Sequence, residues 1–565
     1  MSVDTNNAEF QDALNLIQYT RQSVFLTGKA GTGKSTFLRY VCEHTKKKHV
    51  VLAPTGIAAI NAGGSTMHSF FKLPFYPLLP DDPNLSLQRG RIHEFFKYTK
   101  PHRKLLEQIE LVIIDEISMV RADIIDAIDR ILRVYSHNLR EPFGGKQLLL
   151  VGDVFQLEPV VKNDEREILN RFYPTPYFFS ARVFGQIDLV SIELQKVYRQ
   201  TDPVFVSVLD HIRTNTAGAA DLQLLNTRYG SQIEESEADM YITLATRRDT
   251  VDSINEKKLA ELPGEPITFE GVIEGDFPES SLPTSQELVL KPGAQIIFIK
   301  NDFDRRWVNG TIGVIAGIDE EEETIYVITD DGKECDVKLE SWRNIRYHYN
   351  EKTKEIEEEV LGSFTQYPIR LAWAITVHKS QGLTFSRVVI DFTGGVFAGG
   401  QAYVALSRCT SLDGIQLKKP VNRADVFVRP EIVNFAGRFN NRQAIDKALK
   451  QAQADVQYAA ASRAFDKGDM EECLEQFFRA IHSRYDIEKP VPRRLIRRKL
   501  GIINTLKEQN KKLKEQMREQ QERIRQYAHE YLLMGNECIT QAHDVRAALA
   551  NYDKALSLDP NYIDA

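Results

Sequence analysis

The stretch GKAGTGKS at residues 28–35 decides the fold of this chain. It follows an apolar, strand-like run at residues 24–26 and precedes a helix-like stretch at residues 36–42. In that setting, glycines let backbone N–H groups approach an anion closely, and the start of the helix adds favourable potential. The stretch therefore predicts a P-loop that binds the phosphates of a nucleotide. The residues expected to hold the nucleotide are Gly28, Ala30, Gly31, Thr32, Gly33, Lys34, Ser35 and Thr36.

Acidic residues at the end of a second strand-like run extend this site. The apolar run at residues 111–114 ends in Asp115 and Glu116, and the carboxyl end of a parallel strand lies beside a P-loop. We expect Lys34 to reach the β- and γ-phosphates and the Ser35 hydroxyl to coordinate Mg²⁺. Asp115 is expected to hold Mg²⁺ through water, and Glu116 to activate the attacking water as general base.

A third apolar run, at residues 148–151, is followed by Gln156. This glutamine is a candidate sensor of the γ-phosphate, as glutamine is in other nucleotide hydrolases. A polar loop residue without a catalytic role is the alternative interpretation.

The spacing of apolar runs predicts an α/β fold with parallel sheets, because short strands alternate with amphipathic helices. Proline and aromatic residues interrupt the first sheet, and short strands with tight turns, typical of a small β-barrel, interrupt the second. The predicted domains are residues 1–65 and 103–184 for the first sheet, 66–102 for its insertion, 185–282 and 362–432 for the second sheet, 283–361 for the β-barrel, and 433–565 for a helical region.

Two segments of the helical region resemble halves of tetratricopeptide repeats, residues 468–481 and residues 548–560. Between them, residues recur at alternating spacings of three and four, which is heptad spacing. This helix either packs on its own repeats or pairs in a coiled coil. Its basic excess between Arg493 and Arg525 indicates either a nucleic-acid surface or a solvated face. The heptad residues are Ile503, Leu506, Asn510, Leu513, Met517, Gln520, Ile524, Tyr527 and Tyr531.

The bulk composition is that of a globular protein, with 42% hydrophobic residues, 27% charged residues and a net charge of −7. Five scattered cysteines argue against a zinc site and a disulfide framework. The chain has no apolar run of membrane-spanning length, and its start lacks signal-peptide features. These observations lead us to expect a cytoplasmic, nucleoid-associated protein, or a nuclear one if the source is eukaryotic. The negative total does not exclude nucleic acid, because binding needs only a local positive groove.

Eight motifs in order resemble the PIF helicase family, a superfamily 1 group related to RecD-type helicases. Among them, DEISM follows the second strand at residues 115–119, PFGG occupies 142–145, and GDVFQLEPV occupies 152–160. The other five are residues 53–59, 66–70, 194–200, 372–384 and 403–408. The resemblance covers residues 10–430 and implies two RecA-like P-loop domains with ATP between them. It also implies a strand-separating wedge at 66–102 and an SH3-like module at 283–361.

The resemblance assigns further residues. It implies that Arg199 and Arg408 approach the γ-phosphate as arginine fingers, and that Gln381 and Gly382 join DNA to ATP. The family reads adenine with a glutamine before the P-loop, and Gln11 is the nearest candidate, one residue short of the usual spacing. The residues that the resemblance places on single-stranded DNA are Thr55, Gly56, Thr66, His68, Phe70, His378 and Ser380.

The function implied by the family is an ATP-dependent DNA helicase that moves 5′ to 3′ on single-stranded DNA and unwinds forked or tailed duplexes. Such enzymes serve DNA replication, repair, recombination or telomere-type maintenance. Two alternatives are a nucleotide-switched scaffold that binds a protein through its repeats, and an RNA helicase. The helical tail lies outside the resemblance, and a protein partner or self-association through it is a separate hypothesis.

Overall fold

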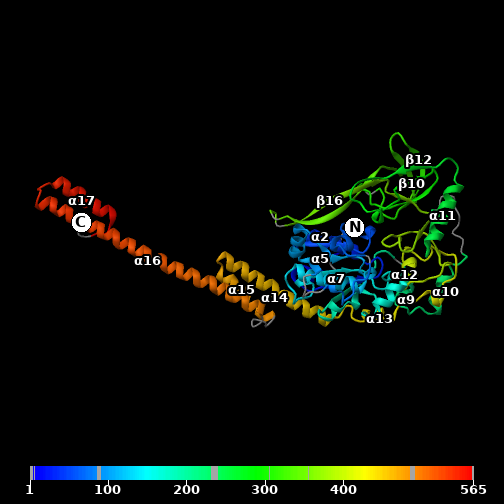
Figure 1. The fold of residues 1–565 in the computed structure, drawn as a ribbon, viewed down its shortest axis with the longest axis horizontal. Helices are drawn as coiled ribbons and strands as arrows, with labels where there is room; N and C mark the ends of the chain where they lie inside the picture. Colours follow the sequence, from blue (N-terminus) through cyan, green and yellow to red (C-terminus); the bar gives the residue numbers. More distant parts are fainter. Residues whose placement is uncertain are drawn as a thin grey trace. The chain divides into compact units, whose positions relative to one another are not determined.

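The computed structural model describes residues 4, 7–74, 76–85, 91–200, 202–230, 240–304, 306–350, 352–353, 355–483 and 490–562. The chain divides into two compact units, residues 1–473 and residues 474–565. Figure 1 shows the fold, with many of the helices and some of the strands labelled. None of the helices in these ranges has the length and apolar character to cross a bilayer.

The first domain is built on six parallel strands in the order β3-β2-β4-β5-β1-β6. Their side chains pack into two apolar cores on opposite faces of the sheet. Phe25 lies in one core, and Val24 and Leu26 lie in the other. The helices α1 (Ala8–Tyr19) and α2 (Lys34–His44) cover one face, and α6 (Lys100–Gln108) and α7 (Ala122–Tyr135) cover the other. The strands are β1 (Val24–Gly28), β2 (His49–Ala53), β3 (Ser65–Thr66), β4 (Leu111–Ile114), β5 (Gln147–Val151) and β6 (Val190–Leu194).

The strand β6 corrects the predicted border at residue 185. It pairs with β1 along its whole length, Val24 to Gly28 against Val190 to Leu194, so it belongs to the first sheet. The reason is packing, because Val190, Ile192 and Leu194 extend the core beneath α1 and α2.

The second domain holds four parallel strands in the order β18-β7-β19-β20, which confirms the prediction of a second α/β domain. Its core packs the sheet against α9 (Pro203–Arg213) and α12 (Gln401–Leu406). The helices α10 (Ala219–Asn226) and α11 (Arg248–Glu261) belong to the same region. The strands are β7 (Ile242–Ala245), β18 (Ala374–Thr376), β19 (Val388–Asp391) and β20 (Ile415–Leu417).

An antiparallel β module interrupts this domain, as the turn pattern predicted. It is wider than the predicted 283–361, because β8 pairs with β10, β9 with β16, and β17 with β11. Its SH3-like character stays a prediction. The strands are β8 (Ile267–Glu270), β9 (Val272–Gly275), β10 (Glu287–Leu290), β11 (Gln295–Phe298), β12 (Ile312–Asp319), β13 (Thr324–Thr329), β14 (Glu334–Val337), β15 (Glu340–Asn350), β16 (Glu355–Gln366) and β17 (Ile369–Leu371).

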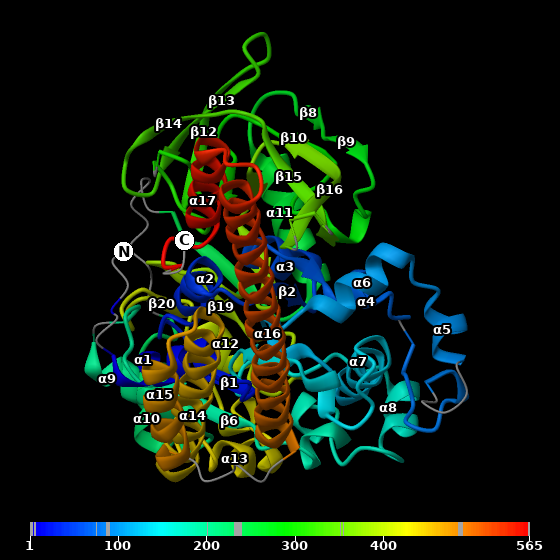
Figure 2. The same cartoon turned by 90° about the vertical axis from the view of Figure 1, so that its left-hand side faces the viewer.

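The insertion at residues 66–102 contains α4 (Met67–Phe71) and α5 (Arg91–Phe96), which Figure 2 shows near α6. Phe70 and Phe71 are buried in the core of the first domain. A DNA contact through Phe70 is therefore wrong, because its ring packs inward against Phe71 and His102. Tyr76 is half exposed, and Phe75 lies outside the described residues.

The first helices of the C-terminal region also belong to the first domain, so the predicted border at residue 433 is wrong. Phe435 of α13 (Pro430–Ala436) packs against Phe25 and Phe178. Ile445 of α14 (Arg442–Lys467) enters the core that α1 shares. The remaining short helices are α3 (Gly56–Ala62) and α8 (Asn163–Leu169).

Long helices make up the second unit, which confirms an all-α tail. The helix α15 (Met470–Ser483) begins just before it, α16 (Pro490–Thr540) has 51 residues, and α17 (Val545–Leu558) folds back on α16. Ala528, Ala548 and Ala555 are buried at that contact. Tetratricopeptide character stays a prediction. The interpretation that the middle helix packs on its own repeats is wrong for residues 504–523, which are exposed throughout.

Candidate nucleotide and DNA site

A pocket of about 520 Å³ lies where the first sheet meets the second domain. The carboxyl ends of β1, β4 and β5 supply one wall, and residues after β6 and from the second domain supply the other. That volume is typical of small-molecule sites. The predicted residues that line it are Ala30, Gly31, Thr32, Gly33, Lys34, Ser35, Thr36, Asp115, Glu116, Gln156, Arg199, Gly382 and Arg408.

The P-loop has the conformation that phosphate binding requires. Gly31 and Gly33 have φ angles of 80° and 89°, in the left-handed region that glycine adopts without strain. A Cβ on Gly31 would lie 2.4 Å from the Cβ of Arg199, so glycine also permits the close approach of that arginine. The Lys34 Nζ donates to the carbonyl of Gly28 at 2.7 Å and that of Lys29 at 3.0 Å, which holds the ammonium inside the loop. Lys34, Ser35 and Thr36, the first residues of α2, line the pocket, so the start of this helix faces the site for an anion.

The two carboxylates beyond β4 are held in distinct ways. Asp115 accepts a hydrogen bond from the Glu116 backbone at 2.9 Å. Glu116 adopts a left-handed backbone conformation, φ 48° and ψ 42°, which costs energy for a residue other than glycine and marks a functional position. Burial, and then the charge of Asp115, raises the pKa of Glu116 to about 7, against the opposing charges of Lys34 and Arg408. Glu116 is thus tuned to exchange a proton near neutral pH.

This pKa predicts an acidic limb in the pH profile of ATP hydrolysis. A general base works only when deprotonated, so kcat/KM should fall about tenfold per pH unit below about pH 7. The measurement is initial rates from acid to neutral pH at saturating Mg²⁺. Glu116→Gln cannot take up the proton. It should therefore lose most of the rate of ATP hydrolysis, and its remaining rate should no longer fall at acidic pH. A wild-type profile that stays level down to the ordinary glutamate pKa of 4.5 contradicts the assignment.

Hard oxygen donors in the pocket fit Mg²⁺. Ser35 and Asp115 both line it, beside Glu116. Over the described ranges, the chain gathers no group of three or more His, Cys, Asp or Glu side chains suited to a metal. The Ser35 and Asp115 oxygens beside a phosphate site suit an ion that completes its shell with phosphates and water, which is how Mg²⁺ binds beside nucleotides.

Two arginines bring positive charge to the same pocket. Arg199 donates from Nη1 to the carbonyl of Ser407 at 3.2 Å. Arg408 is 2% exposed and donates to the carbonyls of Val404, at 3.0 Å, and of Ser380 and Leu383, both at 3.3 Å. Burial, and then the charge of Arg199, lowers the pKa of Arg408 to about 9. Two neighbouring guanidinium groups, Arg408 buried and Arg199 half-buried, repel each other, and an anionic ligand relieves that repulsion.

The P-loop also touches the second domain directly. Lys29 pairs with Asp210 of α9, and the Tyr403 hydroxyl of α12 accepts from the Ala30 backbone at 3.0 Å. A movement between the domains must therefore change contacts at the loop that binds phosphate.

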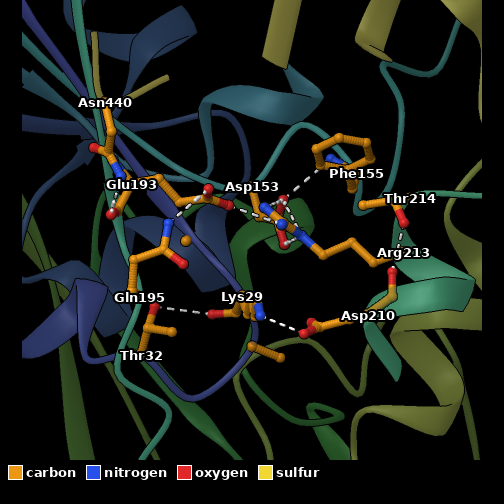
Figure 3. A network of polar contacts seen from close by, with 12 residues as sticks. Lys29, Thr32, Asp153, Phe155, Glu193, Gln195, Asp210, Arg213, Thr214 and Asn440 are labelled. Atoms are coloured by element: carbon orange, nitrogen blue, oxygen red, sulfur yellow. Dashed lines mark hydrogen bonds and ion pairs between the residues drawn. The ribbon is translucent and has the colours of Figure 1, made fainter. Parts of the chain in front are cut away.

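A buried ion pair that we did not predict supports the Gln156 loop. Figure 3 shows Arg213 of α9 reaching Asp153, with contacts at 3.0–3.3 Å, and also Glu193 at 2.8 Å. Asn440 in turn bonds both the N–H and the C=O of Glu193, at 2.8 and 3.0 Å. These partners are far apart in the sequence, so no local pattern points to them.

Adenine recognition through Gln11 stays a prediction. Gln11 lies on α1 and is not among the residues that line the pocket. Asn7, which caps α1, and Phe10 line the pocket instead, together with Asp4 and Tyr198.

A second pocket of about 360 Å³ adjoins the first. Ser35, Asp115, Glu116 and Gly382 line both pockets. Gln381 lines only the second, and its Nε2 is buried with no hydrogen-bond partner in the described part of the chain. A buried amide nitrogen of this kind is suited to donate a hydrogen bond to an acceptor on a ligand.

The structure places some of the predicted DNA-contacting residues in the lining of the second pocket and the others outside it. Thr55 and His378 line the second pocket from the first and second domains, respectively. Gly56 begins α3, where a Cβ would lie 2.5 Å from the Ser281 hydroxyl.

The remaining predicted DNA residues lie outside that pocket's lining. The Thr66 hydroxyl caps α4 by accepting from Ser69 at 3.2 Å, and His68 is half-buried. A DNA contact through the Ser380 hydroxyl is wrong, because this side chain is fully buried and donates to the Val377 carbonyl at 2.7 Å.

A P-loop, a carboxylate pair and two arginines, one after β6 and one from the second sheet domain, define a nucleotide hydrolase with two RecA-like domains. Residues 5–215 match the family model of the PIF1-like helicases. The chain is 34% identical over 412 residues to the ATP-dependent DNA helicase Pif1 of Campylobacter jejuni, covering 70% of this chain and 88% of that protein. A crystal structure of Bacteroides Pif1 with ADP–AlF4 shares 42% identity and a TM-score of 0.70, over 76% of this chain and 96% of that one. The same relative bound to single-stranded DNA aligns at 40% identity and a TM-score of 0.56, over 79% and 99%.

The chain belongs to the PIF1-like helicase family. It is accordingly an ATP-dependent DNA helicase.

Proposed function

We propose that this chain moves 5′ to 3′ along single-stranded DNA and unwinds duplex DNA by hydrolysing ATP with Mg²⁺ between its two sheet domains. The observation that carries the proposal is the shared pocket, in which the P-loop faces Arg199 and Arg408. Guanidinium groups that arrive from a second domain neutralise transition-state charge and link hydrolysis to domain closure. The single-stranded DNA bound by the Bacteroides relative supports the choice of track.

Each residue has a role that its position supports. Lys34 binds the β- and γ-phosphates, Glu116 takes the proton of the attacking water, and Gln156 orients that water. Ser35 and Asp115 hold Mg²⁺, which offsets phosphate charge when bound.

Coupling to DNA follows from the two adjoining pockets. Four residues line both pockets, so the nucleotide pocket and the second pocket lie next to each other. Thr55 and His378 face the second pocket from different domains, so opening and closing the cleft alternates their grip on the strand. Hydroxyl and imidazole contacts to phosphate need little net positive charge.

Polarity is tested with a matched set of tailed duplexes. We expect unwinding of a duplex with a 5′ single-stranded overhang and little or none with a 3′ overhang of equal length and sequence. Strand displacement followed by fluorescence measures both, with RNA versions of each substrate as the comparison. Equal rates on the two overhangs contradict 5′-to-3′ movement. Faster unwinding of the RNA substrates contradicts the proposal that the enzyme moves along DNA.

The helical tail has a separate role in this proposal, which is self-association through α16. Its support is the heptad spacing on a helix that stays exposed from residue 504 to residue 523.

A further inference from the structure

The helix α16 presents an apolar seam that the second unit leaves uncovered. Leu506, Leu513, Met517 and Tyr527 are 58%, 57%, 63% and 54% exposed. They recur at heptad spacing, so they share one face of the helix. Large apolar side chains in a row this long are unusual on a surface without a binding partner.

The rest of the second unit covers only the C-terminal part of α16, on positions beside the seam. The helix α17 packs on α16 around Ala528 and Leu532, where exposure drops to 0% and 8%. From residue 504 to residue 523 every side chain is exposed. Helices in proteins gain most of their stability from packing one face against another surface. We therefore expect this part of α16 to pack against a partner.

We propose that the second surface is α16 of another copy of this chain, in a parallel two-stranded coiled coil along residues 503–527. This inference rests on the self-association proposed above and adds its geometry. In the heptad, Ile503, Asn510, Met517 and Ile524 occupy the a positions, and Leu506, Leu513, Gln520 and Tyr527 occupy the d positions. Isoleucine at a with leucine at d favours two parallel strands, and a single asparagine at a fixes their register.

The flanking positions agree with the parallel arrangement. There, Gln509 lies near the partner's Lys514, and Gln516 lies near the partner's Gln521, so no like charges meet. The antiparallel register that would pair Asn510 with Gln520 brings Lys514 against the partner's Lys514 at the centre. Basic residues such as Lys511 and Arg518 point outward in either case, where water solvates them.

The mass of the full chain in solution tests the association. Light scattering after gel filtration should give about twice the 64.5 kDa of one chain, falling toward 64.5 kDa on dilution. The double variant Leu506→Lys and Leu513→Lys should be a monomer with unchanged helix content by circular dichroism. The matched control Asn504→Lys and Gln526→Lys adds the same two charges outside the seam and should remain a dimer.

A wild-type chain that stays monomeric at its highest soluble concentration, or a seam variant that stays dimeric, overturns the association. Neither result touches the helicase assignment, because unwinding and ATP hydrolysis are read separately.

Cross-linking tests the direction. In a background with Cys42, Cys473 and Cys538 changed to serine, Asn510→Cys should form a disulfide between two chains on mild oxidation. In the antiparallel register the two 510 positions lie roughly 15 Å apart along the axis, too far for that bond. A dimer in which Asn510→Cys fails to cross-link, while Asn510→Cys combined with Gln520→Cys succeeds, overturns the parallel arrangement and leaves self-association intact.

Discussion

Lys34→Ala is expected to abolish ATP hydrolysis and duplex unwinding while leaving most affinity for single-stranded DNA. Lys34 is the P-loop cation held inside the loop by the Gly28 and Lys29 carbonyls, so its ammonium is preorganised for phosphate. Removing a preorganised donor of this kind costs on the order of 10²–10³ in kcat. The second pocket, which Thr55 and His378 line, keeps its contacts to DNA, because Lys34 does not line that pocket.

The measurements are steady-state hydrolysis with single-stranded DNA, strand displacement, and fluorescence anisotropy for DNA affinity. Lys29→Ala is the matched control, because this lysine lies in the same loop but pairs with Asp210 and does not line the nucleotide pocket. It should retain much more activity than Lys34→Ala. Unwinding by Lys34→Ala at a rate near that of the wild type would mean that the nucleotide site lies elsewhere.

Arg199→Ala is expected to lower kcat for ATP hydrolysis by roughly 10³-fold or more while nucleotide binding changes far less. A guanidinium that stabilises charge in the transition state contributes little to ground-state binding, so kcat should fall rather than affinity. Arg199 is a cleaner target than Arg408. Truncating Arg408 would leave several buried carbonyls without their donor, and the fold would suffer.

Single-turnover hydrolysis at saturating ATP measures this loss, and a fluorescent nucleotide measures binding. The control is Arg248→Ala, a change in the second domain at an exposed residue of α11 that pairs with Asp252 and does not line the nucleotide pocket. Equal losses in binding and in kcat would make Arg199 a binding residue. An unchanged kcat would remove its role as an arginine finger.

Sequence reasoning located the parts of the site that a short stretch of chain encodes. The P-loop and the Asp115–Glu116 pair lie at the carboxyl ends of apolar strands, and that placement follows from strand order alone. The two α/β domains and the antiparallel module were also predictable, because their apolar periodicities differ.

The errors concern features that depend on distant packing. Ser380 and Phe70 lie in motifs of the expected kind, yet their side chains turn inward to a carbonyl and to an aromatic core. The border at residue 185 failed because the edge of a sheet is set by pairing with β1, more than 160 residues earlier. The Asp153–Arg213 pair joins a loop to α9 across 60 positions, and charge alone does not identify which arginine is buried.

Asn440 has a mechanical consequence. Its side-chain amide bonds to both the N–H and the C=O of Glu193, and its backbone N–H donates to the Ser191 carbonyl at 3.0 Å. Asn440 therefore satisfies backbone groups along the outer edge of β6. The chain then enters α14, which packs on α1 and adds an ion pair between Arg442 and Asp12 at 2.6 Å. The residues after α14 are therefore joined to the domain that carries the P-loop and not to the second sheet domain.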